Sequence, residues 1–122
     1  MIWAGENQMK LFIEEEEIDV KWVKNLSTKA IDVDVQQNDI VITMSKYGGF
    51  EQVGELGKRY IVEDKHMTTK IGDIVIFNGD KLVIFYGTNS WRYTKLGEIN
   101  LPQNEIIDTL SKSNLKIRLT NG

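Results

Sequence analysis

The stretch that decides the fold is DIVIFNGDKLVIFY, residues 73–86. Its two halves, 73–77 and 81–86, are rich in β-branched and aromatic residues and flank Asn78-Gly79, a strong signal for a tight β-hairpin. Each half is apolar at consecutive rather than alternate positions, which predicts strands buried on both faces. We therefore expect the hairpin to lie in a sheet covered on both sides, as in a barrel with helices packed outside it or across its ends.

Shorter β signals surround this hairpin. We expect further strands at 9–13, 18–22, 40–44, 91–96 and 115–119. Most of these segments alternate apolar and polar residues, and 40–44 is rich in β-branched residues. The acidic run 14–17 predicts a solvated turn. The polar segment 58–70 predicts a long loop with a short strand inside it.

Helical signals are fewer. The segment 27–36 is ambiguous, since Ser27 suits a helix cap and the apolar residues suit a helical stripe, whereas 31–35 alternate as a strand would. Pro102 followed by Ile106 and Leu110 predicts a short amphipathic helix. The pattern as a whole is mostly β with one or two short helices, which indicates a sandwich or a closed barrel.

Composition limits the class of protein. A chain of 122 residues fits one domain, and we expect a loose leader at 1–8 and a single domain at 9–122. The 41% hydrophobic and 27% charged residues are typical of a globular chain, which argues against disorder. The absence of cysteine excludes disulfides, a thiolate nucleophile and Cys-containing zinc sites.

Charge and hydropathy bear on partners and location. The net charge is −3 and no cluster of Lys and Arg is present, so we expect no nucleic-acid partner. No apolar run approaches the ~20 residues of a membrane span, and the first residues lack the pattern of a signal peptide. These observations predict a cytoplasmic protein without a membrane partner.

Two blocks of sequence resemble a known family. YGGFEQVGELG at 47–57 and GDIVIFNGDKLVIFYGTNSWRYTKLG at 72–97 are similar to the signature blocks of the bacterial cyclophilin-like domains. The resemblance spans Met9 to Ile99, and we expect the chain beyond Leu101 to extend past the family pattern. It implies a closed, largely antiparallel cyclophilin-like β-barrel with a helix at 27–36. Shared fold does not carry activity with it.

Catalytic and metal-binding motifs are weak. His66 is the single histidine, and a solvated loop position is the favoured interpretation over a base or metal ligand. Glu63 and Asp64 lack the spacing of a calcium loop. No nucleophile elbow, P-loop or dinucleotide fingerprint is present. We expect no catalytic residue, metal or cofactor.

A cluster of aromatic residues beside glycines is the best candidate site. Amphipathic aromatic side chains next to permissive backbone are suited to a recognition groove. The candidates are Tyr47, Phe50, Glu51, Trp91, Arg92 and Tyr93. The alternative is structural, with Phe50 and Trp91 in the core and Tyr47 and Tyr93 bracing the rim of the barrel.

Three functions remain open at this point. The first is a module that binds a peptide or small molecule in the aromatic groove. The second is a peptidyl-prolyl isomerase, which would be a weak one. Cyclophilin isomerases carry an arginine in a Phe-His-Arg block, and the nearest stretch here, 47–54, has none; Arg92 is the candidate substitute. The third is a domain that docks on a protein partner without catalysis.

Overall fold

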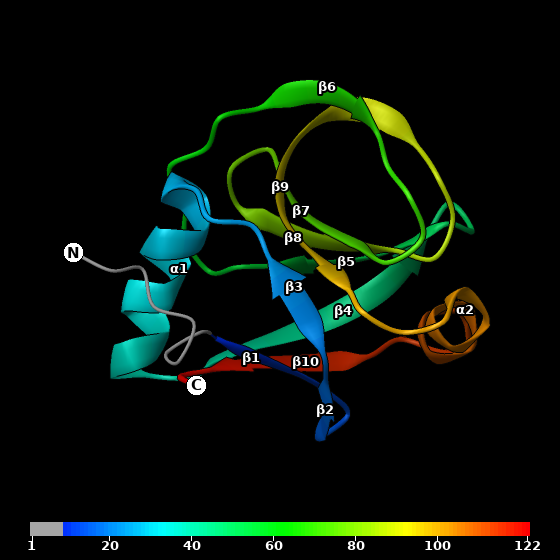
Figure 1. Ribbon diagram of the computed structural model, residues 1–122, viewed down its shortest axis with the longest axis horizontal. Helices are drawn as coiled ribbons and strands as arrows, with labels where there is room; N and C mark the ends of the chain where they lie inside the picture. The colour runs from blue at the N-terminus through cyan, green and yellow to red at the C-terminus, as the bar shows by residue number, and fades with distance from the viewer. Residues whose placement is uncertain (1–8) are drawn as a thin grey trace.

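The computed structural model describes residues 9–122; the expected leader, 1–8, lies outside the described residues. A ten-stranded antiparallel sheet in the order β2-β1-β10-β4-β5-β8-β7-β9-β3, with β6 paired to β9, forms the body of the molecule (Figure 1). The strands are β1 (Lys10–Ile13), β2 (Glu16–Ile18), β3 (Val20–Trp22), β4 (Ile40–Tyr47), β5 (Glu51–Glu55), β6 (Lys65–Thr68), β7 (Asp73–Phe77), β8 (Lys81–Phe85), β9 (Ser90–Ile99) and β10 (Lys116–Thr120).

The sheet curls into a nearly closed barrel because its two end strands follow each other in the chain. β2 pairs with β1, and β3 pairs with β9 at the far end of the strand order. Asp19 joins the two strands, and its carbonyl and carboxylate accept hydrogen bonds from the backbone and side chain of Asn100 at 2.8 and 2.7 Å. The prediction of one strand at 18–22 is therefore wrong: side-chain alternation continues while the chain changes partner.

The two helices lie at opposite ends of the barrel (Figure 1). The ambiguous segment 27–36 lies within α1 (Leu26–Gln37), whose cap is Asn25 rather than Ser27. The Asn25 side chain accepts a hydrogen bond from the Thr28 backbone N–H at 2.9 Å. In return, the Asn25 backbone N–H donates to the Thr28 hydroxyl oxygen at 3.0 Å. This capping box and the burial of Ile31 and Val35 in the barrel core favour the helix over the competing strand.

At the other end, α2 (Gln103–Ser111) follows Pro102 as predicted and buries Ile106 and Leu110. Gln52 of β5 is fully buried, and its amide nitrogen donates to the carbonyls of Leu110 and Ser113 at 2.7 and 2.8 Å. These bonds satisfy carbonyls that the end of a helix leaves free, so they fix α2 to the barrel.

The β7–β8 hairpin is buried on both faces, as predicted. Ile74, Ile76, Leu82 and Ile84 point into the main core inside the barrel. On the outer face, Val75, Val83 and Phe85 form a second core with Tyr93, against which Phe50, Val53, Met67 and Phe77 pack. The expected covering by helices is wrong for this outer face, because a bent strand covers it instead.

That bent strand is β9. Its C-terminal half pairs with β7 at residues 94–98, and its N-terminal half leaves β7 and pairs with β6 at residues 90–93. The ladder with β7 shifts register between Ile74 and Val75, which is the irregularity expected where a strand bends. Figure 1 shows β9 curling with β6 away from the barrel strands. The bend places Tyr93 over the outer face of the hairpin.

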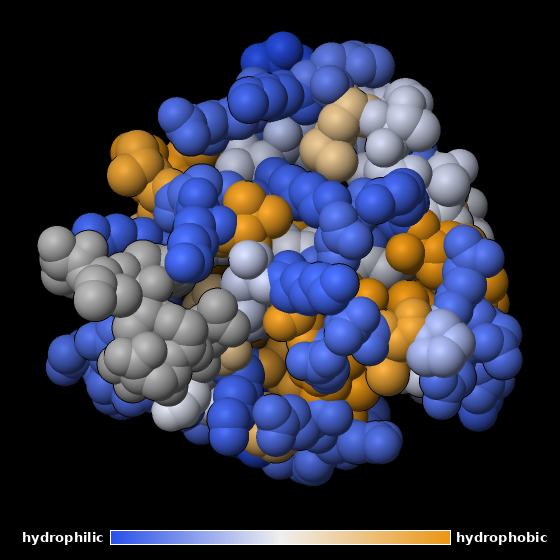
Figure 2. Space-filling model, in the orientation of Figure 1, coloured by the Kyte–Doolittle hydropathy of each residue, from blue (hydrophilic) through white to orange (hydrophobic). Residues whose placement is uncertain are grey.

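Figure 2 shows how hydrophilic and hydrophobic residues are distributed over one face of the molecule. On this face the two kinds of residue are interspersed, and hydrophobic residues are most evident in the lower middle and right of the view. The prediction of a mostly β, closed antiparallel barrel with one or two short helices is confirmed: the barrel is nearly closed, and the described residues form two helices.

The hairpin turn generates a stability prediction. Phe77 pairs with Lys81, and the turn between them has φ of 56° at Asn78 and 75° at Gly79. A β-branched side chain strongly disfavours this backbone, so Gly79→Val should lower the free energy of unfolding by roughly 1–3 kcal/mol. Urea denaturation followed by circular dichroism measures the loss, and an unchanged midpoint would show that the turn relaxes at no cost.

Candidate functional site

An open cleft of about 390 Å³ lies on the outer face of the barrel. Its floor comes from β5, β7 and β8, and the bent half of β9 forms a wall. The volume is within the range of small-molecule sites. The lining residues are Tyr47, Phe50, Glu51, Val53, Phe77, Lys81, Val83, Asn89, Trp91 and Tyr93. The structure thus brings together five of the six candidates from the sequence: Tyr47, Phe50, Glu51, Trp91 and Tyr93.

Strand alternation positions the floor of the cleft. In β5, Glu51 and Val53 point outward, while Gln52 points inward to hold α2. Across the ladder, Glu51 pairs with Phe85 and Val53 pairs with Val83. The carboxylate of Glu51 is therefore held by a central strand, next to the buried ring of Phe85.

A chain of aromatic contacts builds the cleft. The Tyr93 ring meets the Phe85 ring edge to face at 5.5 Å, and Phe77 meets Tyr93 at 6.1 Å. Phe50 stacks parallel to Phe85 at 6.4 Å, and Tyr47 contacts Phe50 edge to face at the same separation. Such pairs are favourable beyond the area they bury, so the rings form a continuous, preformed surface.

The β4–β5 turn sets the rim. Gly48 has φ of 65°, and a Cβ there would clash with the ring of Phe50. Glycine lets the ring of Phe50 fold back over the turn toward Phe85. Tyr47 and Trp91 remain 66% and 57% exposed, so these two rings are available to a ligand, whereas Tyr93 is buried in the second core.

Glu51 is the unusual group in the cleft. Only 7% of the residue is exposed, and none of the hydrogen bonds or ion pairs found within residues 9–122 involves its carboxylate. Burial raises the pKa of Glu51 to about 7, because the ionised form loses hydration without gaining a partner. The cleft therefore contains a carboxyl that changes charge near neutral pH.

The other polar groups around Glu51 have partners. Lys81 Nζ contacts Asp80 at 3.0 Å and Glu55 at 3.4 Å. The side-chain amide of Asn89 donates to the Tyr93 hydroxyl at 2.7 Å. Burial raises the pKa of Tyr93, the hydrogen bond from Asn89 lowers it in part, and the charge of Glu51 raises it further.

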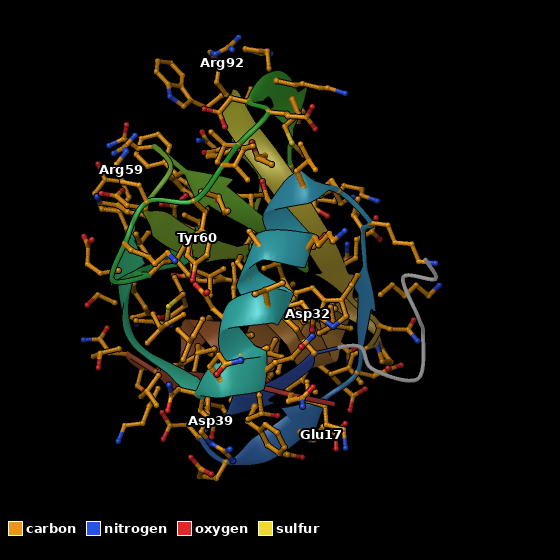
Figure 3. The ribbon with its side chains drawn as sticks, turned by 90° about the vertical axis from the view of Figure 1, so that its left-hand side faces the viewer. Glu17, Asp32, Asp39, Arg59, Tyr60 and Arg92 are labelled. Carbon is orange, nitrogen blue, oxygen red and sulfur yellow. The ribbon has the colours of Figure 1, made fainter. Side chains whose placement is uncertain are left out.

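Arg92 does not line the cleft. Positions 91 and 93 of β9 face the cleft, so position 92 faces away, and the Arg92 side chain extends outward from the molecule (Figure 3). Its guanidinium donates to the backbone carbonyl of Asp64 at 3.2 Å. Because neighbouring side chains of a strand point to opposite faces, Arg92 faces away from Trp91 and Tyr93. The sequence prediction grouped all three residues without taking this alternation into account.

Sequence reasoning also missed part of the lining. The missed residues are Val53, Phe77, Lys81, Val83 and Asn89. Phe77 and Val83 occupy alternate positions of the doubly apolar hairpin, so the pattern contained a signal for them. Asn89 lies in a turn, and only the bend of β9 brings it to the cleft.

A second hollow, about 300 Å³ beside α1, is built differently. Asp34 accepts a hydrogen bond from the Tyr60 hydroxyl at 2.7 Å and pairs with Lys58 at 2.9 Å (Tyr60 is labelled in Figure 3). Burial first, and then Asp34, raise the pKa of Tyr60. The polar groups here pair with one another, which is typical of a structural network.

The remaining sequence candidates lie apart from the cleft. His66 is exposed on β6, opposite Arg92 in the ladder. The Asp64 carboxylate accepts from the Thr94 hydroxyl at 2.7 Å, so it braces β9. Across residues 9–122, no group of three or more His, Asp or Glu side chains is arranged to hold a metal ion. No helix in that range is long and apolar enough to cross a membrane.

Fold and cleft together define an antiparallel β-barrel with a ligand-sized cleft on its outer face. The model of the cyclophilin-like family matches residues 11–120, and the chain belongs to that family. The match includes α2 and β10, so the expectation that the chain beyond Leu101 extends past the family pattern is wrong. No curated protein matches the chain in sequence.

Two aromatic residues of the cleft should differ in their effect on stability. Trp91 is 57% exposed, so Trp91→Ala should cost less than about 1 kcal/mol of unfolding free energy. Tyr93 is 4% exposed and packs on Phe85, so Tyr93→Ala should cost roughly 3–5 kcal/mol. Thermal melts of both variants measure the difference, and equal losses would contradict the assignment of Trp91 to the rim.

Proposed function

We propose that this chain is a binding module whose ligand, a peptide segment or a small molecule, occupies the aromatic cleft. The observation that carries the proposal is the combination of a preformed apolar floor with two exposed rings, Tyr47 and Trp91, at its rim. Large exposed rings beside a concave apolar surface are characteristic of binding sites rather than of inert surface.

The rigidity of the cleft supports the same function. Phe85 and Tyr93 are buried and in contact, so the packing that supports the floor and the wall exists before a ligand arrives. A preformed site loses little conformational entropy on binding, which favours recognition of a small group.

A fragment screen by heteronuclear NMR tests the proposal. We expect chemical-shift changes from small aromatic fragments to cluster on the β4–β5 turn and the N-terminal half of β9. Trp91→Ala should weaken these interactions at least about tenfold while the fold is kept, because the variant removes a rim ring without opening the core. Ile107→Ala, on the exposed side of α2, is the matched control. Shifts that cluster elsewhere, or that Trp91→Ala leaves unchanged, would refute the assignment.

The geometry favours binding over prolyl isomerisation. Rotation about the peptide bond has a barrier of roughly 18–20 kcal/mol, so an isomerase needs donors that stabilise the twisted amide. None of the lining residues found within 9–122 is an arginine, and Arg92 donates to Asp64 on the far side of β9.

We therefore expect little acceleration of cis/trans exchange. Loss of one such donor commonly costs about 10²–10³ in rate in other enzymes. A protease-free assay on a proline tetrapeptide measures the exchange rate with and without the protein. Turnover close to that of an ordinary cyclophilin, abolished by Arg92→Ala, would overturn this expectation and make the chain an isomerase.

A further inference from the structure

Among the described residues, Glu51 is the one acidic side chain that lines the cleft; the other polar side chains there can donate hydrogen bonds. Glu51 offers two carboxylate oxygens without a protein partner among the hydrogen bonds found in residues 9–122. The Tyr93 hydroxyl already accepts from the amide nitrogen of Asn89, which leaves the Asn89 side-chain oxygen as a further acceptor at the wall. A ligand that pairs with the ionised Glu51 carboxylate must bring a hydrogen-bond donor.

Two cations on the strands around the cleft, Lys81 and Arg92, have other partners. Lys81 lines the cleft, but its ammonium group lies between Asp80 and Glu55. Arg92 is held by the Asp64 carbonyl on the opposite face of β9. Among residues 9–122, no ion pair gives the Glu51 carboxylate the counter-ion that a buried charge normally has.

The aromatic rings that line the cleft also favour a cationic ligand. Tyr47, Phe50, Phe77, Trp91 and Tyr93 all contribute to the lining. The faces of aromatic rings attract ammonium and guanidinium groups, and the effect is larger where water is excluded. An acidic group surrounded by rings is a complementary environment for a positively charged nitrogen.

We propose that the cleft selects a cationic nitrogen, an amine or a guanidinium carried on an apolar body, with the Glu51 carboxylate as its counter-ion and the aromatic rings as its walls. This inference rests on the proposed binding function and specifies the class of ligand. The apolar body lies on the floor of Val53 and Val83, and the nitrogen reaches Glu51. The same chemistry occurs in a free arylalkylamine and in a Lys or Arg side chain of a peptide.

The titration of Glu51 makes the proposal testable. The groups that face it are Tyr47 from β4, Lys81 from β8 and Tyr93 from β9; Lys81 is charged and paired, and Tyr93 has a pKa raised above its usual alkaline value. Near neutral pH the charge that changes is therefore that of Glu51, whose pKa is about 7 in the free protein. A bound cation favours the ionised carboxylate, so affinity should rise with pH through that value and level off above it.

Calorimetric titration with phenethylamine, phenethyl alcohol and phenylacetate measures the preference. These probes share an aromatic ring and are respectively cationic, neutral and anionic between pH of about 5.5 and about 8.5. We expect phenethylamine to bind about 30-fold more tightly at the upper pH than at the lower, as the ionised fraction of a group with pKa of about 7 increases. Phenethyl alcohol should show no such dependence, and phenylacetate should bind more weakly as pH rises.

Glu51→Gln is the matched variant, since it removes the charge and keeps the shape. We expect it to abolish the pH dependence and to weaken phenethylamine binding about tenfold or more at the upper pH, with phenethyl alcohol unaffected. Folding is checked independently. The pKa of Glu51 is raised in the folded state, so its contribution to stability is present below about 4.5 and lost as pH rises to about 7. The variant should therefore melt higher than the wild type at neutral pH and match it in acid.

The outcomes separate the two proposals. Equal affinities for phenethylamine and phenethyl alcohol, tighter binding of phenylacetate, or binding of uncharged fragments alone would overturn the cationic assignment and leave a binding module. Absence of any fragment from the cleft would overturn both. A blocked tetrapeptide containing Lys, compared with its norleucine analogue, tests the peptide source. Binding of the Lys peptide identifies a basic segment as ligand, and binding of phenethylamine alone identifies a free amine.

Discussion

The structure depends on the packing of Tyr93 against Phe85 on the outside of the barrel. The rings meet edge to face at 5.5 Å, and both side chains are almost completely buried. Without this contact, the outer face of the β7–β8 hairpin would present Val75, Val83 and Phe85 to water, which exposes a large apolar patch. The bend of β9 places Tyr93 over this face and so covers it. The cleft is the space left between the bent strand and the face that it covers.

The same contact accounts for the chemistry of the cleft. Glu51 lies opposite Phe85 in the β5–β8 ladder, so the register that buries Phe85 on the outer face of the barrel also places Glu51 on that face. An unpaired carboxyl at such a position costs stability in its ionised form. The proposed cationic ligand would recover that cost, which would account for an acidic residue at this position.

Much of the fold could be predicted from the sequence. Residues 73–86 indicate a hairpin buried on both faces, and the blocks at 47–57 and 72–97 indicate the cyclophilin-like family. The split of 18–22 at Asp19 could not be predicted, because alternation records which face a side chain occupies and not which strand it pairs with. The local pattern left 27–36 ambiguous between helix and strand. The capping box at Asn25 is part of what makes 26–37 a helix.

The sequence also predicted only part of the candidate cleft, because local patterns do not show which strands lie side by side. Aromatic residues near glycines marked Tyr47, Phe50 and Trp91, but their common location depends on the bend of β9, which is a tertiary feature. Arg92 was misplaced because adjacency in sequence was taken as adjacency in space, although neighbours in a strand face opposite ways. The environment of Glu51 could not be deduced at all, since burial depends on what covers a residue.

The bent β9 covers the face of the barrel on which Glu51 lies, and the residue is 7% exposed as a result. The most direct test is an NMR titration that follows the side-chain carboxyl carbon of Glu51 with pH in the free protein. The account predicts a midpoint of about 7, which reflects burial without a counter-ion. A midpoint at or below the ordinary value of 4.5 would show a hydrated or paired carboxylate and would contradict the account.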